Sequence, residues 1–317
     1  MWCVDCHGQF LRSSDGLPRA RWLDLLGDLE ELGVPSVSYS GAYTDPATDE
    51  ELLSSLLKRG ARRWGVKLHT CGLALTERVR GAVLYAAGQG IGDNFVNLSK
   101  VAVDQRTFER MCRPSGSLQT ENERLTALFR AGEGCEGFFT IRLNCRLTRI
   151  NGTVRHLTEL LRWLASTSDR VPIRFTTDYQ PTSAPPEYCS WFRQKVYLPP
   201  AEAQDAIARA VEATGFRATR VSFRAAEGAH YAGDRCYNGL LLAAVSANGM
   251  VFPCQGIASS KFAAVAYGDL RQESFLDAWR RYVFAWPTSS RRHDCPRCVG
   301  ACEGHINAAL KREVESC

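Results

Sequence analysis

The amino-acid sequence predicts an α/β fold, with a parallel sheet or barrel of strand–helix units followed by a small cysteine-rich C-terminal region. Short apolar runs alternate with longer amphipathic segments at a period of about 30 residues, which is typical of βα units. The composition of the 317 residues, 45% hydrophobic and 23% charged, is that of a globular protein and excludes disordered and coiled-coil classes. In addition, eight of the 13 cysteines lie within the first six residues or in the last third of the chain, which indicates metal or iron–sulfur chemistry there.

Five predicted strands, separated by helices, occupy the first two-thirds of the chain. The strands are Val34–Ser40, Trp64–Thr70, Phe95–Ser99, Phe138–Cys145 and Val171–Thr177. The helices are Arg19–Leu32, one from about Thr48, Thr76–Ala87, Asp104–Cys112, Gln119–Ala131 and Thr153–Ala165. The pattern Thr48-x-x-Glu51 resembles a capping box, so we expect Thr48 to cap the second helix.

The pattern changes after Asp178. Residues 180–186 (QPTSAPP) are rich in Pro and Ser and predict a linker, which is followed by a helix at Ala201–Thr214 and a strand at Ala218–Phe223. Asn248-Gly249 between two apolar runs predicts a hairpin, and a helix is expected at Gln272–Phe284. The predicted domains are a βα domain at 1–180, a connecting segment at 181–230 and a cysteine-rich domain at 231–317.

Charge and hydropathy exclude several classes of protein. The 39 Lys and Arg residues nearly balance the 34 Asp and Glu residues and are scattered, so no nucleic-acid partner is expected. No run of about 18 apolar residues exists, and the opening MWCVDCHGQF lacks the apolar stretch of a signal peptide. We therefore expect a cytoplasmic protein that does not associate with a membrane.

The cysteines near the C-terminus have the spacing of a metal or cluster site. Cys236 and Cys254 bracket the predicted hairpin, and Cys295 and Cys298 form a Cys-x-x-Cys knuckle. A knuckle and a hairpin pair together supply four thiolates, which suits a structural zinc ion or an iron–sulfur cluster. Cys302 and Cys317 remain after the four ligands of one such site are assigned.

The other cysteines divide into one pair and five single residues. Cys3 and Cys6 form a second Cys-x-x-Cys pattern just ahead of the βα array, where a loop leaving a first strand would stand. Single cysteines in apolar stretches are usually small core residues, and we expect this of Cys71, Cys112, Cys135, Cys145 and Cys189.

These motifs resemble those of radical S-adenosylmethionine enzymes with a C-terminal SPASM or Twitch auxiliary-cluster domain. Cys3 and Cys6 match the second and third cysteines of the family's C-x3-C-x2-C motif, and His69-Thr70-Cys71-Gly72 stands where the family has a T-N-G turn. Ser40-Gly41-Ala42 resembles the GGE motif, which holds the amino group of S-adenosylmethionine in the family. The resemblance implies that the cofactor is bound by Ser40, Gly41, Ala42, Asn97, Ser99, Arg142 and Asn144.

The C-terminal region carries the rest of the resemblance. Cys236, Gly249 and Cys254, followed by Cys295 and Cys298, fit the Twitch pattern, and Cys302-x-Gly304 is similar to the end of SPASM domains. The metal ligands that the resemblance implies are Cys3 and Cys6 for a catalytic 4Fe–4S cluster, and Cys236, Cys254, Cys295 and Cys298 for an auxiliary 4Fe–4S cluster, with Cys302 and Cys317 as further ligands of that cluster or of a second. The implied fold is a partial (β/α)6 TIM-type barrel, of which this sequence lacks the first strand.

The sequence departs from the family pattern near Met1. No cysteine stands four residues before Cys3, and Asp5 and Ala42 occupy the positions of an aromatic residue and a glutamate in the family motifs. A core barrel strand cannot be dropped without exposing unpaired edge groups, so we expect the sequence to be truncated before the first cluster cysteine.

The function that the resemblance implies is reductive cleavage of S-adenosylmethionine to a 5′-deoxyadenosyl radical, which abstracts a hydrogen atom from a small-molecule or peptide substrate. The auxiliary cluster would assist oxidation or cross-linking, and a flavodoxin- or ferredoxin-type protein would donate electrons. Asp178 and Tyr179, after the last predicted strand of the array, are candidates for substrate contact. The alternative is a degenerate, non-catalytic scaffold protein that binds an iron–sulfur cluster or zinc.

Overall fold

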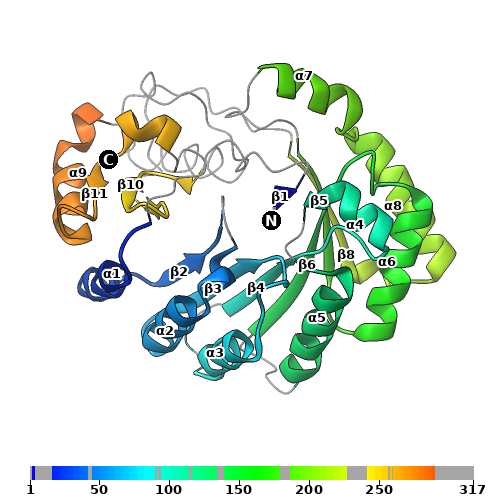
Figure 1. The fold of residues 1–317 in the computed structure, drawn as a ribbon, viewed down its shortest axis with the longest axis horizontal. Helices are drawn as coiled ribbons and strands as arrows, with labels where there is room; N and C mark the ends of the chain where they lie inside the picture. Colours follow the sequence, from blue (N-terminus) through cyan, green and yellow to red (C-terminus); the bar gives the residue numbers. More distant parts are fainter. Residues whose placement is uncertain are drawn as a thin grey trace, which may run out of the picture. The chain divides into compact units, whose positions relative to one another are not determined.

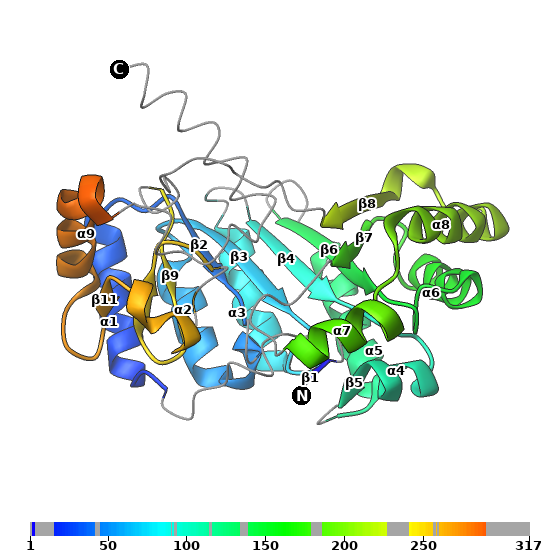
Figure 2. The ribbon, with the colours of Figure 1, turned by 90° about the horizontal axis from the view of Figure 1, so that it is seen from above.

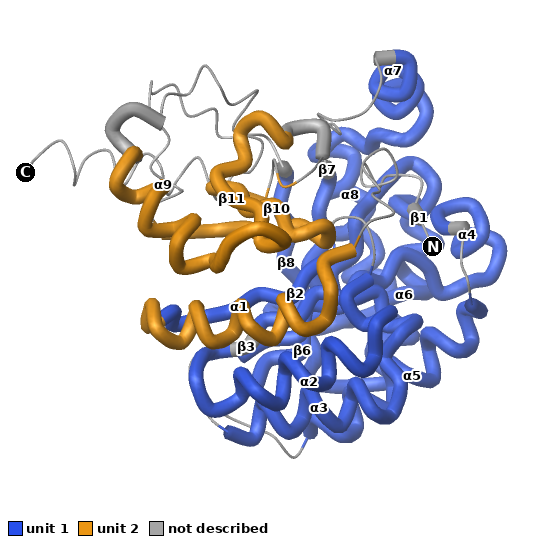
Figure 3. The backbone as a smooth tube through the Cα atoms, turned by 60° about the vertical axis from the view of Figure 1, so that its left-hand side comes forward, with its two compact units in different colours: residues 1–10, 34–225 blue, residues 11–33, 226–317 orange. Residues whose placement is uncertain are grey.

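The computed structural model describes residues 2–3, 16–41, 45–89, 91, 94–113, 116–133, 139–178, 186–226, 241–255, 258 and 260–289. The chain divides into two compact units, shown in different colours in Figure 3. Unit 1 comprises residues 1–10 and 34–225, and unit 2 comprises residues 11–33 and 226–317. Unit 1 therefore extends past the predicted boundary at residue 180, and the helix at Arg19–Glu31 belongs to unit 2.

Unit 1 is built on a six-stranded sheet in the order β2-β3-β4-β6-β7-β8. The strands are β2 (Ser36–Tyr39), β3 (Gly65–Thr70), β4 (Asn94–Ser99), β6 (Phe139–Leu147), β7 (Ile173–Asp178) and β8 (Val221–Ala226). Neighbouring strands from β2 to β7 pair in parallel. All five strands predicted before residue 178 are present, so the predicted α/β fold with a parallel sheet is confirmed, and the sheet is compatible with a partial barrel.

Helices alternate with these strands, and Figure 1 shows α2, α3 and α5 along one face of the sheet. The helices of unit 1 are α2 (Glu50–Gly60), α3 (Glu77–Gly88), α4 (Gln105–Met111), α5 (Leu118–Gly132), α6 (Val154–Thr167), α7 (Pro186–Lys195) and α8 (Pro200–Thr214). Each of α2 to α6 begins where a side-chain oxygen accepts a hydrogen bond from a first-turn backbone N–H. The capping residues are Asp49, Thr76, Asp104, Ser117 and Thr153, in that order.

The start of α2 and the helix α7 differ from the sequence predictions. Asp49 caps α2, whereas Thr48 ends a 3-10 turn (Pro46–Thr48) and its hydroxyl donates to the Asp45 carbonyl. The expected capping box at Thr48 is therefore wrong by one residue, because the aspartate oxygen reaches the Leu52 N–H at 3.0 Å. Helix α7 begins at Pro186, the last residue of the predicted linker.

The two faces of the sheet have opposite character. Leu68, Val96, Leu98, Leu143 and Phe175 are at most 1% exposed and point toward the helices. Most of the alternate residues are polar and only half-buried, with Phe95 an aromatic exception. Because successive strand residues point to opposite faces, this alternation explains why one face packs under helices and the other carries functional groups.

A small two-stranded sheet lies outside the main sheet of unit 1. Strand β1 (Trp2–Cys3) pairs antiparallel with β5 (Cys112–Arg113), and Cys3 stands opposite Cys112. In the described part of the chain, β1 therefore extends a segment next to α4 and is not a strand of the parallel sheet.

Unit 2 combines helix α1 (Arg19–Glu31) with a three-stranded sheet in the order β11-β10-β9 and helix α9 (Phe275–Ser289). The strands are β9 (Ala244–Val245), β10 (Met250–Phe252) and β11 (Gly268–Asp269), and a 3-10 helix spans Ser260–Val265. The predicted hairpin is present, and Gly249 takes the positive φ of +87° that its turn requires. The predicted helix near Gln272–Phe284 is α9.

The core of unit 2 explains why α1 belongs to it. Leu17 and Leu25 pack with Val251, Leu270 and Phe275 in one buried cluster, to which Trp22, Leu29 and Leu32 add half-buried contacts. Most of the apolar face of Arg19–Leu32 that the sequence shows therefore packs against the hairpin and α9 within unit 2.

Candidate functional site

The cofactor-binding residues expected on β4 and β6 lie side by side on the polar face of the sheet. Asn97 is paired with Arg142, and Ser99 with Asn144, in the parallel register of these two strands. Asn97, Arg142 and Asn144 are half-buried and Ser99 is exposed. Ser99 is the last residue of β4, so the Ser99–Asn144 pair lies nearer than the Asn97–Arg142 pair to the carboxyl ends of the strands, the edge at which parallel α/β sheets usually bind ligands.

The amide of Asn97 has one polar atom without a partner. Its Nδ2 lies 3.1 Å from His69 Nδ1, while its buried Oδ1 makes no hydrogen bond within the described part of the chain. A buried acceptor without a partner costs free energy, and a ligand with an N–H or O–H group would remove that cost. The polar face can thus accept a ligand that offers a hydrogen-bond donor to Asn97 Oδ1.

The segment after β2 is fastened to the end of β3 by Asp45. The carboxylate of Asp45 accepts hydrogen bonds from Thr70 Oγ1 at 2.8 and 2.9 Å, from the Cys71 N–H at 2.6 Å and from the Ala47 N–H at 2.9 Å. Ser40 and Gly41 stand exposed at the carboxyl end of β2, and Ala42 lies outside the described residues. Sequence reasoning missed the role of Asp45, although an Asp-Pro pair at the start of a helical turn signals a cap.

The turn after β3 has the geometry that its sequence suggests. Gly72 has φ +83°, and a Cβ placed on it would lie 2.7 Å from Leu125 Cδ2, so no other residue fits without a shift. Burial, the nearby Asp45 charge and its hydrogen bond raise the pKa of the neighbouring Cys71 thiol well above its usual value. Cys71 is therefore a protonated thiol, in agreement with its interpretation as a structural residue.

Two of the predicted metal ligands lie in the described part of the chain. Cys3 is in β1, and Cys254 follows β10 in the hairpin of unit 2, where it is half-buried. Cys254 packs against the small cluster of Phe252 and Ala258. The remaining predicted ligands, Cys6, Cys236, Cys295, Cys298, Cys302 and Cys317, lie outside the described residues.

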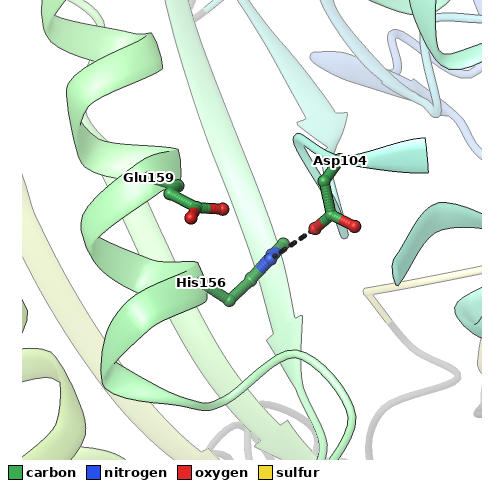
Figure 4. A group of neighbouring side chains, drawn as sticks. All are labelled: Asp104, His156 and Glu159. Carbon is green, nitrogen blue, oxygen red and sulfur yellow. Dashed lines mark hydrogen bonds and ion pairs between the residues drawn. The ribbon is translucent and has the colours of Figure 1, made fainter. Parts of the chain in front are cut away.

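A second group of possible metal ligands joins α4 and α6. Asp104, His156 and Glu159 bring their ligand atoms within 4.8 Å of one another (Figure 4). Asp104 Oδ2 lies 3.3 Å from His156 Nδ1, and Glu159 forms an ion pair with Arg155 at 3.1 Å. Burial lowers the pKa of His156 despite the nearby Asp104 charge, so the imidazole is neutral at pH 7. The contact of Asp104 with His156 and the ion pair of Glu159 with Arg155 explain the group as a structural link between α4 and α6.

None of the helices in the described part of the chain is both long and apolar enough to cross a membrane.

Comparison with known families identifies the C-terminal part of the chain. No curated protein matches the chain in sequence. Residues 236–303 match the family model of SPASM, the iron-sulfur cluster-binding domain. The matched stretch contains five of the predicted metal ligands, Cys236, Cys254, Cys295, Cys298 and Cys302. The hairpin that carries Cys254 is therefore part of an iron–sulfur cluster-binding SPASM domain.

Proposed function

We propose that the protein is a radical S-adenosylmethionine enzyme whose SPASM domain holds an auxiliary 4Fe–4S cluster. The match of residues 236–303 to the SPASM family carries this proposal, since that domain typically accompanies a radical S-adenosylmethionine domain. A parallel α/β sheet with polar residues on one face, in the same chain, supports it. The substrate would be a small molecule or a peptide, and a flavodoxin- or ferredoxin-type protein would supply electrons.

Cysteine thiolates would hold both clusters. In the proposal, the auxiliary cluster takes Cys236, Cys254, Cys295 and Cys298, with Cys302 and Cys317 as further ligands, and a catalytic cluster takes Cys3 and Cys6. Thiolates are the usual protein ligands of such clusters. When bound, a catalytic cluster would supply the electron that cleaves S-adenosylmethionine reductively.

The chain's own residues would bind and orient the cofactor on the polar face of the sheet. Ser40, Gly41 and Ala42 would meet its amino end, while Asn97, Ser99, Arg142 and Asn144 would contact its other polar groups. The partnerless Oδ1 of Asn97 supports this assignment, because a hydroxyl or ammonium of the cofactor would satisfy it. The bonds from Asp45 to the end of β3 would hold the Ser40–Gly41 segment in place.

One observation favours the alternative of a non-catalytic scaffold protein that binds an iron–sulfur cluster or zinc. Cys3 lies in a strand paired with β5 and not at the end of a strand of the parallel sheet. Ala42 also stands at the position of the family's glutamate. The residues proposed to bind the cofactor therefore match the family motifs less completely than the cysteines of the SPASM domain do.

The test is anaerobic reconstitution with iron and sulfide, followed by metal analysis and an assay for 5′-deoxyadenosine with dithionite and S-adenosylmethionine. Because the motif around Cys3 lacks its first cysteine, the assay would also use a version extended upstream of Met1. We expect about eight irons per chain in the active form, since each 4Fe–4S cluster contributes about four. Cys254→Ser should lose about half of the iron, and Cys3→Ser should lose the other half together with 5′-deoxyadenosine formation.

Two other outcomes would contradict the proposal. About four irons, without 5′-deoxyadenosine from either version, would identify the scaffold protein instead. Stoichiometric zinc in a colourless protein would exclude iron–sulfur chemistry altogether. Cys189→Ser, on helix α7, is the matched control and should retain the iron content of the unmodified chain.

A further inference from the structure

His69 lies beside one of the proposed cofactor-binding residues. In the parallel pairing of β3 with β4, His69 stands opposite Asn97, and Figure 2 shows these two strands side by side. The two side chains meet, since His69 Nδ1 lies 3.1 Å from Asn97 Nδ2. The imidazole of His69 is therefore in place to control the amide of Asn97.

The amide of Asn97 has two possible orientations that differ by a half-turn. In one, Nδ2 donates a hydrogen bond to an unprotonated His69 Nδ1, whereas in the other Oδ1 accepts a hydrogen bond from a protonated Nδ1. The structure has the first orientation, in which the buried Oδ1 has no hydrogen-bond partner among the described residues. The first orientation offers a ligand an acceptor, and the second would offer it a donor. His69 therefore decides which kind of ligand group Asn97 can bind.

The surroundings of His69 keep its imidazole neutral. Burial lowers the pKa of His69, and the charges of Arg142 and Lys67 lower it further. Both cations lie near the Phe95 ring, with Arg142 Cζ at 5.3 Å and Lys67 Nζ at 5.7 Å from its centroid. A neutral imidazole carries one proton and accepts a hydrogen bond at its other nitrogen. At pH 7, His69 can thus accept the hydrogen bond from Asn97 when its proton is on Nε2.

The position of the His69 ring allows Nε2 to hold that proton. The ring is only half-buried, and in the described part of the chain Nε2 is not a buried atom that lacks a partner, so it can donate to water. Phe95 supports the ring, since the two rings meet edge to face at a centroid distance of 5.4 Å and an interplanar angle of 86°. Nδ1 is thereby held toward Asn97.

We propose that His69 is a positioning residue, which holds the Asn97 amide so that Oδ1 accepts a hydrogen bond from a hydroxyl or ammonium of the cofactor. The identity of this ligand rests on the proposed function, whereas the contact between His69 and Asn97 does not. A buried acceptor without a partner costs free energy. Because the amide is oriented in advance, a donor of the ligand removes that cost without first turning the side chain.

The first test locates the proton of His69 by NMR. The reconstituted full chain is labelled with 15N in its histidine rings, and the His69 signals are assigned by their loss in His69→Leu. At about pH 8, well above the usual histidine pKa, we expect a protonated Nε2 and an unprotonated Nδ1. A proton on Nδ1 would overturn the proposal, because Oδ1 would then have to face His69.

The second test measures the affinity for S-adenosylmethionine by equilibrium dialysis, with the reconstituted chain and with the version extended upstream of Met1. His69→Leu removes the acceptor of Asn97 Nδ2 and should weaken binding about fivefold, the effect of one ordinary hydrogen bond. His69→Asn supplies an amide oxygen in place of Nδ1 and should restore affinity to within about twofold. The matched control is His156→Asn on α6, which should bind the cofactor as the unmodified chain does.

A double-mutant cycle shows whether His69 acts through Asn97. Asn97→Ala removes the amide and should itself weaken binding. The addition of His69→Leu should cause no further loss, since no amide is left to orient. Losses that add in the double variant would overturn the proposal. The same holds if His69→Leu binds as tightly as the unmodified chain, or if His69→Asn binds as weakly as His69→Leu.

The two tests separate failure of this proposal from failure of the proposed function. A chain that binds S-adenosylmethionine and forms 5′-deoxyadenosine, but has the His69 proton on Nδ1, contradicts only the role of His69. A chain with an unprotonated Nδ1 that binds no S-adenosylmethionine in either version contradicts the proposed function, and with it the cofactor as the ligand of Asn97.

Discussion

At the scale of single residues, the least expected feature is a buried ion pair behind the sheet. Lys100 follows β4 directly, is fully buried, and donates a hydrogen bond to Glu121 of α5, whose side chain is also buried. Its ammonium lies 5.2 Å from the centroid of the Trp163 ring. Burial lowers the pKa of Lys100 and raises that of Glu121, although each charge opposes the shift of the other. Both side chains can stay buried because each supplies the opposite charge and the hydrogen-bond partner that the other needs.

Removal of one partner of this pair should be costly. Lys100→Met leaves a buried carboxylate without its cation, and we expect the free energy of unfolding to fall by about 3–5 kcal/mol at pH 8. The loss should be smaller near pH 4.5, because the pKa of Glu121 is raised in the folded state and the carboxyl group takes up a proton as the pH falls. The measurement is urea unfolding at both pH values.

Two further variants check that interpretation. The double variant Lys100→Met with Glu121→Leu should recover much of the lost stability, since an apolar pair can replace a buried ion pair. Arg155→Met removes a partner of the exposed pair with Glu159 and should change stability by at most about 1 kcal/mol. Equal losses for Lys100→Met and Arg155→Met would show that the buried pair has no special role.

At the scale of elements, helix α1 holds the SPASM-containing unit together from a distant part of the sequence. Asp28 of α1 accepts hydrogen bonds from the N–H groups of Phe275 and Leu276, at 2.7 and 3.3 Å, and so caps α9. Arg21 donates to the carbonyls of Leu270 and Glu273, each at 2.6 Å. The bonds to Asp28 satisfy N–H groups at the start of α9 that have no partner within the helix, and the bonds from Arg21 fasten the segment just before it.

We expect Asp28→Ala to destabilise unit 2 by about 1 kcal/mol, the usual cost of a lost N-cap. The matched control is Asp24→Ala on the same helix. The Asp24 carboxylate is exposed, and its ion pair with Arg21 is long, at 3.8 Å. Hydrogen exchange of the α9 amides would measure the effect. A loss of protection equal in the two variants would argue against a capping role for Asp28.

At the scale of the whole molecule, two units with separate cores share one chain that crosses between them more than once. Unit 2 takes residues 11–33 from one part of the sequence and 226–317 from another. Its described core is small, and small domains commonly depend on a bound metal or cluster for stability. Unit 1 has the six-stranded sheet and its helices as a core of its own.

Loss of the auxiliary cluster should therefore loosen unit 2 selectively. In Cys254→Ser, we expect faster hydrogen exchange in α9 and, despite its place near the N-terminus, in α1 as well. The amides of β3, β4 and β6 should keep their protection, because their hydrogen bonds lie within unit 1. Protection retained in α1 while it is lost in α9 would contradict the assignment of α1 to the stability of unit 2.

Local patterns made much of this structure predictable. The strands β2, β3, β4, β6 and β7, the helices α3 to α6 and the hairpin at Gly249 follow from side-chain periodicity and turn residues, which act over a few positions. The placement of Asn97 beside Arg142 follows once the strands are paired in parallel. The cysteine spacing, another local pattern, indicated the cluster-binding domain that the SPASM match identifies.

The sequence by itself thus determined the βα alternation, the polar and apolar faces of the strands and the chemistry of the C-terminal cysteines. Only the tertiary structure decided that α1 packs with α9, that Asp45 ties the end of β3, that Lys100 meets Glu121 and that Lys67 and Arg142 share the Phe95 ring. Periodicity shows that a face will be buried or polar, but not which distant segment lies against it. That choice depends on the packing of all segments at once, which no local pattern records.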